Sequence, residues 1–134
     1  MTKEEKKKVV DFCCSYIPTR LRIEQTQKDI AMFEKRLNAE NISAFEKRLM
    51  ATSIQRKKDR VEEDRKTLLL FETAMTDLDG LDLLVFRQLY VEGRQQNEVT
   101  NSEGQKMARS WVNERRDRAV KAIGDYILSF LSKV

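Results

Sequence analysis

An apolar residue recurs every seven positions along the first third of the chain, and this spacing constrains the fold more than any other feature of the sequence. The row consists of Val9, Tyr16, Ile23, Ile30 and Leu37. A companion row three residues further on consists of Phe12, Thr19, Thr26 and Phe33. A period of seven places these side chains on one face of an α-helix and is typical of a coiled-coil seam. We therefore expect a long helix over this stretch.

A second heptad row predicts a second helix. Its members are Ile54, Val61, Leu68 and Met75, with Leu69, Phe71 and Leu78 widening the apolar stripe at its end. The polar segment 38–43 separates the two rows and is expected to form a turn. Two heptad helices joined by a short polar link should fold back on each other, so residues 1–78 are predicted to form a helical hairpin or coiled coil.

Local signals mark the helix ends within this region. Thr2 with Glu5, and Ser43 with Glu46, have the spacing of a capping box, in which each side chain bonds the free N–H of the other residue. Pro18 lacks an N–H, so we expect a kink or a short break near Tyr16. The sequence Phe-Glu-Lys-Arg-Leu occurs at 33–37 and again at 45–49, an offset of twelve that is about 120° out of phase on one helix and supports a break between the copies.

The composition excludes several classes of fold and function. One Pro and four Gly in 134 residues are too few for a β-sandwich or barrel, so an all-α fold is expected. The chain has no His, and its two cysteines are the neighbours Cys13 and Cys14. A histidine-dependent enzyme, a zinc site and a disulfide-rich secreted module are therefore not expected. We predict a non-enzymatic protein without metal or cofactor. It should lie in a reducing cytoplasm, without a membrane-spanning segment.

Charge is unevenly distributed over the second half. Residues 69–93 carry a local charge of −4, whereas residues 105–121 carry +4. A basic stretch behind an acidic one suggests an anionic partner at the C-terminal end.

Residues 79–134 are predicted to form a helix-turn-helix. A short amphipathic helix begins after Gly80 and ends near Gly93, a brace helix is expected at 95–101, and a last helix runs from about Lys106 to Leu131. The brace would pack Val99 against Val112 of the last helix. The apolar end of that helix, from Ile123 onward, must be covered either by the N-terminal hairpin or by a second subunit.

The polar face of the last helix supplies the candidate DNA contacts. Arg and Asn suit bidentate bonding to guanine and adenine in the major groove. The predicted base contacts are Arg109, Ser110 and Asn113. Phosphates are expected to meet the remaining basic and amide side chains, on the brace and along the helix. The predicted phosphate contacts are Arg94, Gln95, Gln96, Lys106, Arg116, Arg118 and Lys121.

The order of residues in this half resembles the helix-turn-helix of sigma-factor region four. The resemblance is carried by Leu84, Phe86, Leu89-Tyr90, Glu92-Gly93, Glu98-Val99, Gly104, Val112 and Arg118-Ala119-Val120. A long charged helical half before this module is similar to small phage-encoded late regulators, the ArpU-like and RinA-like group. The resemblance implies a regulator that binds double-stranded DNA in a bacterial host cell, with RNA polymerase as a further candidate partner.

This sequence departs from the family pattern around the turn. Gln95 replaces the usual capping Ser or Thr, Glu103 precedes the Gly, and Arg115 stands where an apolar residue is usual. The spacing from Gly104 to Val112 is two residues longer than usual, and Trp111 adds bulk. Two interpretations stay open: DNA binding by a shifted helix, or conversion of the module to protein contact.

Three functions are therefore carried forward. The first is a phage or prophage transcriptional regulator, a homo-oligomer (a dimer) that reads the major groove with the helix starting near Lys106. The second is recognition of a DNA-packaging site, as in small terminase subunits, which ring-like assembly would distinguish. The third is a protein-binding adaptor or inhibitor of host machinery, which would use the acidic 69–93 surface.

Overall fold

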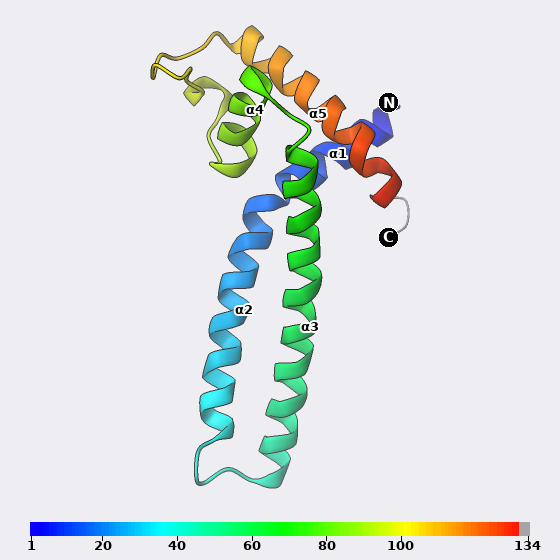
Figure 1. Cartoon of the computed structure of the whole chain (residues 1–134). Helices are drawn as coiled ribbons and strands as arrows, with labels where there is room; N and C mark the ends of the chain where they lie inside the picture. Colours follow the sequence, from blue (N-terminus) through cyan, green and yellow to red (C-terminus); the bar gives the residue numbers. More distant parts are fainter. Residues whose placement is uncertain (132–134) are drawn as a thin grey trace. The chain divides into compact units, whose positions relative to one another are not determined.

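The computed structural model describes residues 1–131, whose regular structure is helical (Figure 1). Five α-helices follow one another along these residues: α1 (Lys3–Cys14), α2 (Tyr16–Leu37), α3 (Ala44–Met75), α4 (Gly80–Phe86) and α5 (Arg109–Leu131). The π-helical turn η1 (Arg87–Val91) continues α4, and the 3-10 turn η2 (Gln96–Glu98) lies in the connection to α5. The predicted all-α class is confirmed for this part of the chain.

The chain divides into two compact units, with boundaries that differ from the predicted ones. The hairpin unit contains residues 18–68, and the composite unit joins residues 1–17 to the chain from residue 69 onward. The predicted division between residues 78 and 79 does not coincide with these units. The reason is that α1 and the last turns of α3 contribute buried side chains to the same core as α4 and α5.

Local hydrogen bonds set where α1 begins and ends. The hydroxyl of Thr2 accepts from the N–H of Glu5 at 3.1 Å, and the Glu5 carboxylate accepts from the N–H of Thr2 at 2.9 Å. At the other end, the Ser15 hydroxyl donates to the Phe12 carbonyl at 2.6 Å. α2 starts at the next residue, and Pro18 lies in its first turn, where no N–H is needed. The predicted break near Tyr16 is confirmed.

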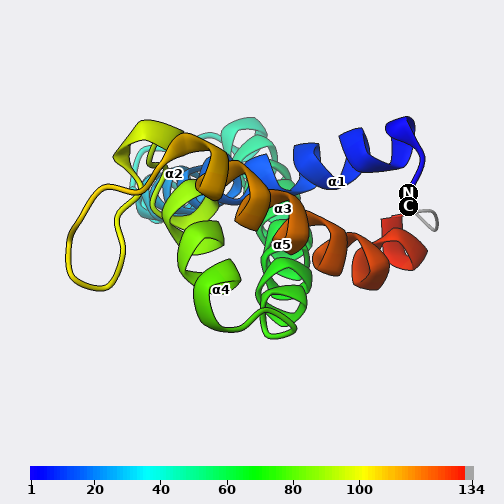
Figure 2. The same ribbon diagram turned by 90° about the horizontal axis from the view of Figure 1, so that it is seen from above.

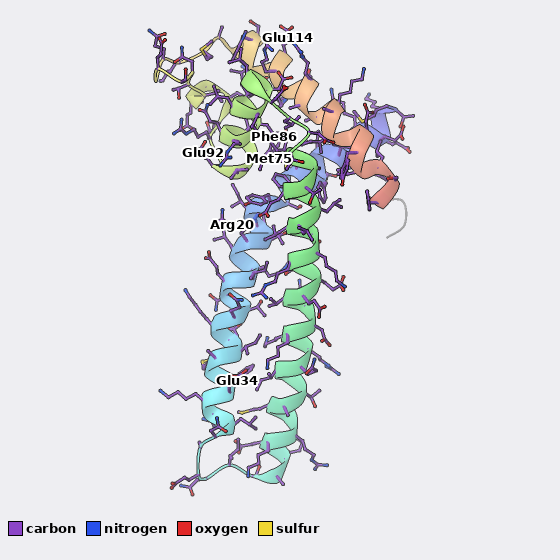
Figure 3. All side chains as sticks on the ribbon, viewed as in Figure 1. Arg20, Glu34, Met75, Phe86, Glu92 and Glu114 are labelled. Atoms are coloured by element: carbon purple, nitrogen blue, oxygen red, sulfur yellow. The ribbon has the colours of Figure 1, made fainter. Side chains whose placement is uncertain are left out.

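In the hairpin unit, α2 and α3 pack side by side, and their heptad rows meet in one apolar seam (Figure 1). The buried residues are Ile23, Ile30, Ile54 and Val61, with Phe33, Leu37 and Leu68 packed against them. All but Phe33 belong to the two main heptad rows, and Phe33 belongs to the companion row. Glu34 of α2 pairs with Lys58 of α3 at 3.4 Å beside this core (Figure 3). The period of seven therefore identified the residues that face the seam.

Polar side chains lie among the buried residues of the hairpin unit, and one of them, Asp64, has a charged partner. Thr19, Thr26 and Asp64 are all buried. The guanidinium of Arg22 donates to both oxygens of Asp64, from Nε to Oδ2 at 2.8 Å and from Nη2 to Oδ1 at 2.7 Å. These hydrogen bonds hold the pKa of Asp64 below its ordinary value. A carboxylate inside a narrow seam is thus kept ionised by a paired arginine.

The two copies of Phe-Glu-Lys-Arg-Leu have opposite environments. Phe33 and Leu37 pack on the hairpin core, whereas Phe45 is 66% exposed and Leu49 is 58% exposed. The copies lie on different helices, α2 and α3, and each starts at a different heptad position. Leu69, expected in the buried stripe, is 64% exposed because it lies about 100° around α3 from its partly buried neighbour Leu68.

A chain of aromatic rings crosses the composite core. The Phe71 ring contacts Tyr16 at 4.4 Å and Phe86 at 5.5 Å between ring centroids, and Phe86 contacts Tyr90 at 4.8 Å (Figure 3 labels Phe86). Phe71 comes from the end of α3, Tyr16 from the start of α2, and the other two from α4 and η1. Three segments distant in sequence are therefore joined by stacked apolar rings.

α1 and α5 run alongside each other in this unit (Figure 2). Val9, Ile123 and Ile127 are fully buried. A Cβ atom added at Gly124 would lie 3.2 Å from Val9 Cγ2, so the absence of a side chain permits this close approach. The apolar end of the last helix is thus covered, at least in part, by the N-terminal helix.

The connection between α4 and α5 differs from the predicted one. The brace helix expected at 95–101 is the single 3-10 turn η2, and α5 begins at Arg109 rather than near Lys106. The side-chain oxygen of Asn101 accepts the N–H groups of Glu103 and Gln105, both at 2.9 Å. These bonds close a turn after Asn101. Within the predicted brace, the N–H of Thr100 bonds the Gln88 side chain and the N–H of Asn101 bonds the Gln105 carbonyl, both at 2.9 Å, so neither forms a helical bond. Lys106 instead forms an antiparallel bridge with Thr100, and this connecting loop projects outward in Figures 1 and 2.

Candidate nucleic-acid interface

Three arginines of the composite unit converge on one open groove of about 540 Å³. We call it the arginine groove. Its lining residues are Leu89, Tyr90, Arg94, Gln95, Gln96, Asn97, Arg109 and Arg116. They come from η1, from the loop around η2 and from the first two turns of α5. Five of the predicted DNA contacts are thereby brought together, although they were assigned to two different roles.

Helical spacing places the arginines of α5. Arg109 and Arg116 are seven residues apart, which is close to two turns, so both side chains leave the same face. Arg109 is exposed and forms no hydrogen bond or ion pair with any residue in the described range 1–131. Arg116 is half-buried and its Nη2 lies 3.3 Å from Asp117 Oδ1. The groove therefore contains one arginine whose charge is not shared with a protein carboxylate.

The third arginine is held by Gln88, a residue that the sequence analysis did not single out. Gln88 is 4% exposed, and its Oε1 accepts from Arg94 Nη1 and from the N–H of Thr100, both at 2.9 Å. Its Nε2 donates to the Thr100 carbonyl at 2.7 Å. One amide thus bonds both backbone groups of Thr100, as a neighbouring strand would. The available signal was a Gln on the apolar face of a helix, four residues after Leu84.

The π-helical turn positions this amide. In η1 the N–H of Glu92 reaches the carbonyl of Arg87 at 2.9 Å, five residues back. The N–H of Arg94 then bonds the Gln88 carbonyl at 2.8 Å. Gln88 therefore fixes Arg94 through its backbone and its side chain together. Single π turns within helices are frequent at functional sites.

Tyr90 gives the groove an aromatic wall with a polar end. Its ring packs at 4.8 Å on Phe86, which is fully buried. Burial raises the pKa of Tyr90 to about 12, so its hydroxyl keeps its proton at neutral pH. A neutral phenol beside the three arginines can donate a hydrogen bond to an anion.

The remaining predicted contacts lie outside the groove lining. Arg118 Nε lies 3.6 Å from Asp82 Oδ2, and Arg115 Nη1 lies 3.4 Å from the other oxygen of the same carboxylate. Lys106, Ser110 and Lys121 are exposed. Arg118 is therefore partly neutralised, while the two lysines are available to an anionic surface.

Asn113 and Arg115 each bury a polar atom without a partner. Among the described residues, Asn113 Oδ1 and Arg115 Nε are the buried side-chain atoms that lack a hydrogen bond. A bidentate contact with adenine needs both the oxygen and the nitrogen of the amide. Asn113 must rotate its amide before it can make that contact. In sigma-factor region four the position matching Arg115 is usually apolar. Here the Arg115 guanidinium carbon lies over the Trp111 ring, 5.5 Å from the ring centroid.

The predicted contact between the brace segment and the last helix is present, although the brace segment is not an α-helix. Val85, Val99 and Val112 are fully buried and form one cluster, with Leu89, Met107 and Trp111 packed against it. The N–H of Met107 bonds the Val99 carbonyl at 3.0 Å, which closes the loop between them. The predicted contact of Val99 with Val112 is thus present, made from extended backbone.

Membrane-spanning helices and clusters of metal-binding residues are absent from residues 1–131. No helix within residues 1–131 is long and apolar enough to cross a membrane. The same residues contain no cluster of three potential metal ligands, and burial raises the pKa of Cys13 to about 12.

Comparisons with family models, with curated proteins and with solved structures found no match to this chain.

Proposed function

We propose that this chain is a DNA-binding transcriptional regulator of phage or prophage origin, with the arginine groove and the first turns of α5 as its DNA-binding surface. One observation carries the DNA binding: Arg109 and Arg116 of α5 line one groove together with Arg94, which comes from the loop before η2. The regulatory role and the phage origin rest on the resemblance to sigma-factor region four. The host cytoplasm as its location, and RNA polymerase as a further partner, belong to the same proposal.

Phosphate contacts would supply most of the affinity. Guanidinium groups bind phosphate oxygens in a bidentate manner, and each phosphate neutralised releases counterions. Arg109 is best placed to do so because it has no carboxylate partner among residues 1–131. Lys106 and Lys121 are exposed and add further positive charge to this unit. Binding should therefore weaken steeply as salt rises.

Base recognition would fall to the exposed face of the first α5 turns. Ser110 is exposed there, and Asn113 lies one turn further along. Arg109 is close enough to the groove to serve either a base or a phosphate. Since the brace helix is absent, docking would use α5 together with the projecting loop 100–108. The major groove of B-DNA, about 12 Å wide, admits a single helix of this kind.

The test is retention of random duplex fragments by the purified full chain at low and at roughly physiological salt. Arg116→Ala should weaken binding to every sequence and lower the salt slope by about 0.9. Arg109→Ala should relax sequence preference if the residue reads a base, and should act like Arg116→Ala if it binds a phosphate. Lys28→Ala removes an exposed positive charge from the hairpin unit and serves as the control.

Absence of duplex retention even at low salt would refute this function. A palindromic motif with half-sites about one helical turn apart would indicate a dimer and fix its register. Sizing of the free chain by light scattering then checks the proposed dimer directly.

A protein-binding adaptor is the second candidate, and the hairpin unit favours it. Phe45 and Leu49 on α3 are 66% and 58% exposed, and Leu21 and Met32 on α2 are both 59% exposed. Apolar side chains grouped on a surface mark protein contact sites, and Phe45 and Leu49, four residues apart, share one face of α3. Capture of a defined host protein that is lost on Phe45→Ser, with duplex binding absent, would support this role.

A further inference from the structure

The lining of the arginine groove contains more than phosphate contacts require. Leu89 and Tyr90 contribute apolar surface, and Gln95, Gln96 and Asn97 contribute amides. A duplex backbone presents charged oxygens and sugars to a protein but keeps its base faces stacked inside. Duplex binding therefore leaves the apolar surface of Leu89 and Tyr90 without a role, even where the amides bond phosphates.

The dimensions of the groove match a small ligand. Its volume of about 540 Å³ falls within the roughly 300–1,000 Å³ of clefts that bind small molecules. A lone phosphate would fill only a small part of it. The groove can hold a phosphate together with an attached ring system.

Two lining groups are fixed before a ligand arrives. Arg94 is held at 2.9 Å by the buried amide of Gln88, and the Tyr90 ring packs at 4.8 Å on Phe86. Groups already in position lose little conformational entropy on binding. The groove therefore has a pre-arranged positive end and a pre-arranged aromatic wall.

The charges at the groove leave room for an anion. Arg109 has no ion pair among the described residues. Arg94 and Arg116 share their charge with Glu92 at 3.8 Å and Asp117 at 3.3 Å, and these carboxylates are 48% and 49% exposed. Ion pairs at such exposure are weak, so a phosphate can compete for both arginines.

We propose that the arginine groove binds one nucleotide, with its phosphate at the arginines and its base against Tyr90 and Leu89. The amides of Gln95, Gln96 and Asn97 would bond the edge of the base. A charged phosphate, a flat π face and an edge of donors and acceptors are the features that proteins use to bind an unstacked nucleotide. The nucleotide can be free or an unpaired residue of a DNA strand. Its binding does not depend on the proposed duplex binding.

The test is a titration of the ¹⁵N-labelled full chain followed by NMR. The probes are 5′-dAMP and 5′-dTMP, with deoxyadenosine and inorganic phosphate as partial ligands. We expect the backbone amides of residues 94–97 and of Arg109 to shift. The mononucleotide should bind at least about tenfold more tightly than either partial ligand, because the two parts act together.

Variants separate the two ends of the ligand. Arg109→Gln should weaken nucleotide binding about tenfold. Tyr90→Leu should weaken binding of the mononucleotide but leave that of inorganic phosphate unchanged, a pattern that a general loss of structure would not give. Lys28→Gln removes an exposed charge from the hairpin unit, outside the groove lining, and should change nucleotide affinity less than about twofold.

Two results would overturn the nucleotide site. One is unshifted amides at residues 94–97 with millimolar mononucleotide, and the other is equal affinity for mononucleotide and inorganic phosphate. Comparison with a 5′-phosphorylated single-stranded octanucleotide identifies the source, since the tighter of the two ligands is the natural class. Duplex retention is measured in parallel on the same variants, so its failure leaves the nucleotide result intact.

Discussion

The hairpin unit and the composite unit are both helical, yet their cores are built in opposite ways. The hairpin core is one apolar seam, to which each of two neighbouring helices contributes residues at heptad spacing. The composite core joins α1 to the end of α3, α4 and α5, although residues 18–68 separate α1 from the other three in the sequence. A periodic row can be found by reading along the chain, whereas an assembled core depends on contacts that no local pattern contains.

The same contrast appears in how each unit uses a buried polar residue. Asp64 in the hairpin is bonded twice by Arg22, a charged partner on the facing helix. Gln88 in the composite unit is neutral and bonds an extended loop and an arginine of the groove. Asp64 therefore stabilises the regular seam of the hairpin unit, and Gln88 positions the irregular surface of the composite unit.

The largest expected effect comes from the assembled core. Phe71→Ala removes a ring that is 1% exposed and contacts three others. We expect it to lower the free energy of unfolding by about 4 kcal/mol, measured by urea denaturation. Leu69→Ala, two residues away and 64% exposed, is the control and should cost less than about 1 kcal/mol. Similar losses in the two variants would contradict this account of the core.

Gln88→Leu should come next. It removes both hydrogen bonds to the Thr100 backbone and should cost about 2 kcal/mol. Hydrogen exchange should speed up at Thr100, and the groove arginine Arg94 should lose its fixed position, which weakens duplex binding. Gln25→Leu changes an exposed Gln whose partner is Asp29 and should leave both readouts unchanged. Intact exchange protection at Thr100 would show that the amide is not the group that holds the loop.

Asp64→Asn tests the hairpin seam and should cost about 1–2 kcal/mol, less than a fully buried pair because Arg22 is partly exposed. The pKa of Asp64 is lowered in the folded state. Its contribution is therefore present above the ordinary Asp pKa of about 3.9 and is lost as pH falls through the lower folded value. Urea denaturation across acidic pH should show this loss in the parent and not in the variant.

The smallest effects compare the two copies of the repeated pentapeptide. Phe33→Ala should cost about 1–2 kcal/mol because the ring packs on the hairpin core. Phe45→Ala should change stability by less than about 0.5 kcal/mol because the ring is 66% exposed. Thermal unfolding of both variants measures the difference. A larger loss for Phe45→Ala in the isolated chain would mean that this side chain is covered in solution.

The sequence predicted the helical class, the heptad seam and the break near Tyr16 because each depends on neighbours within one or two turns. Leu69 was wrongly predicted to lie in the buried stripe, because the stripe was extended by one residue beyond Leu68 around the helix. The brace helix was also wrong, since the N–H of Thr100 bonds the Gln88 side chain and the N–H of Asn101 bonds the Gln105 carbonyl instead of carbonyls four residues back.

The groove itself could be predicted only in part. Arg109 and Arg116 were both predicted as DNA contacts on the polar face of the last helix, although in different roles. Their convergence with Arg94 could not be read from the chain, because it depends on Gln88 reaching across to Thr100. The role of Tyr90 likewise depends on the ring of Phe86 beneath it.

The wider turn η1 makes chain length a sensitive property of this region, in addition to the identities of Gln88 and Tyr90. Its hydrogen bond from Glu92 to Arg87 spans one residue more than an α-helical bond does. Deleting any one residue between 87 and 91 would return the segment to an ordinary α-helix and rotate the downstream chain by about 100°. Conservative substitutions here should be tolerated better than a single-codon deletion. Among descendants of this sequence, an unchanged residue count between Phe86 and Gly93 would mark those that keep the groove.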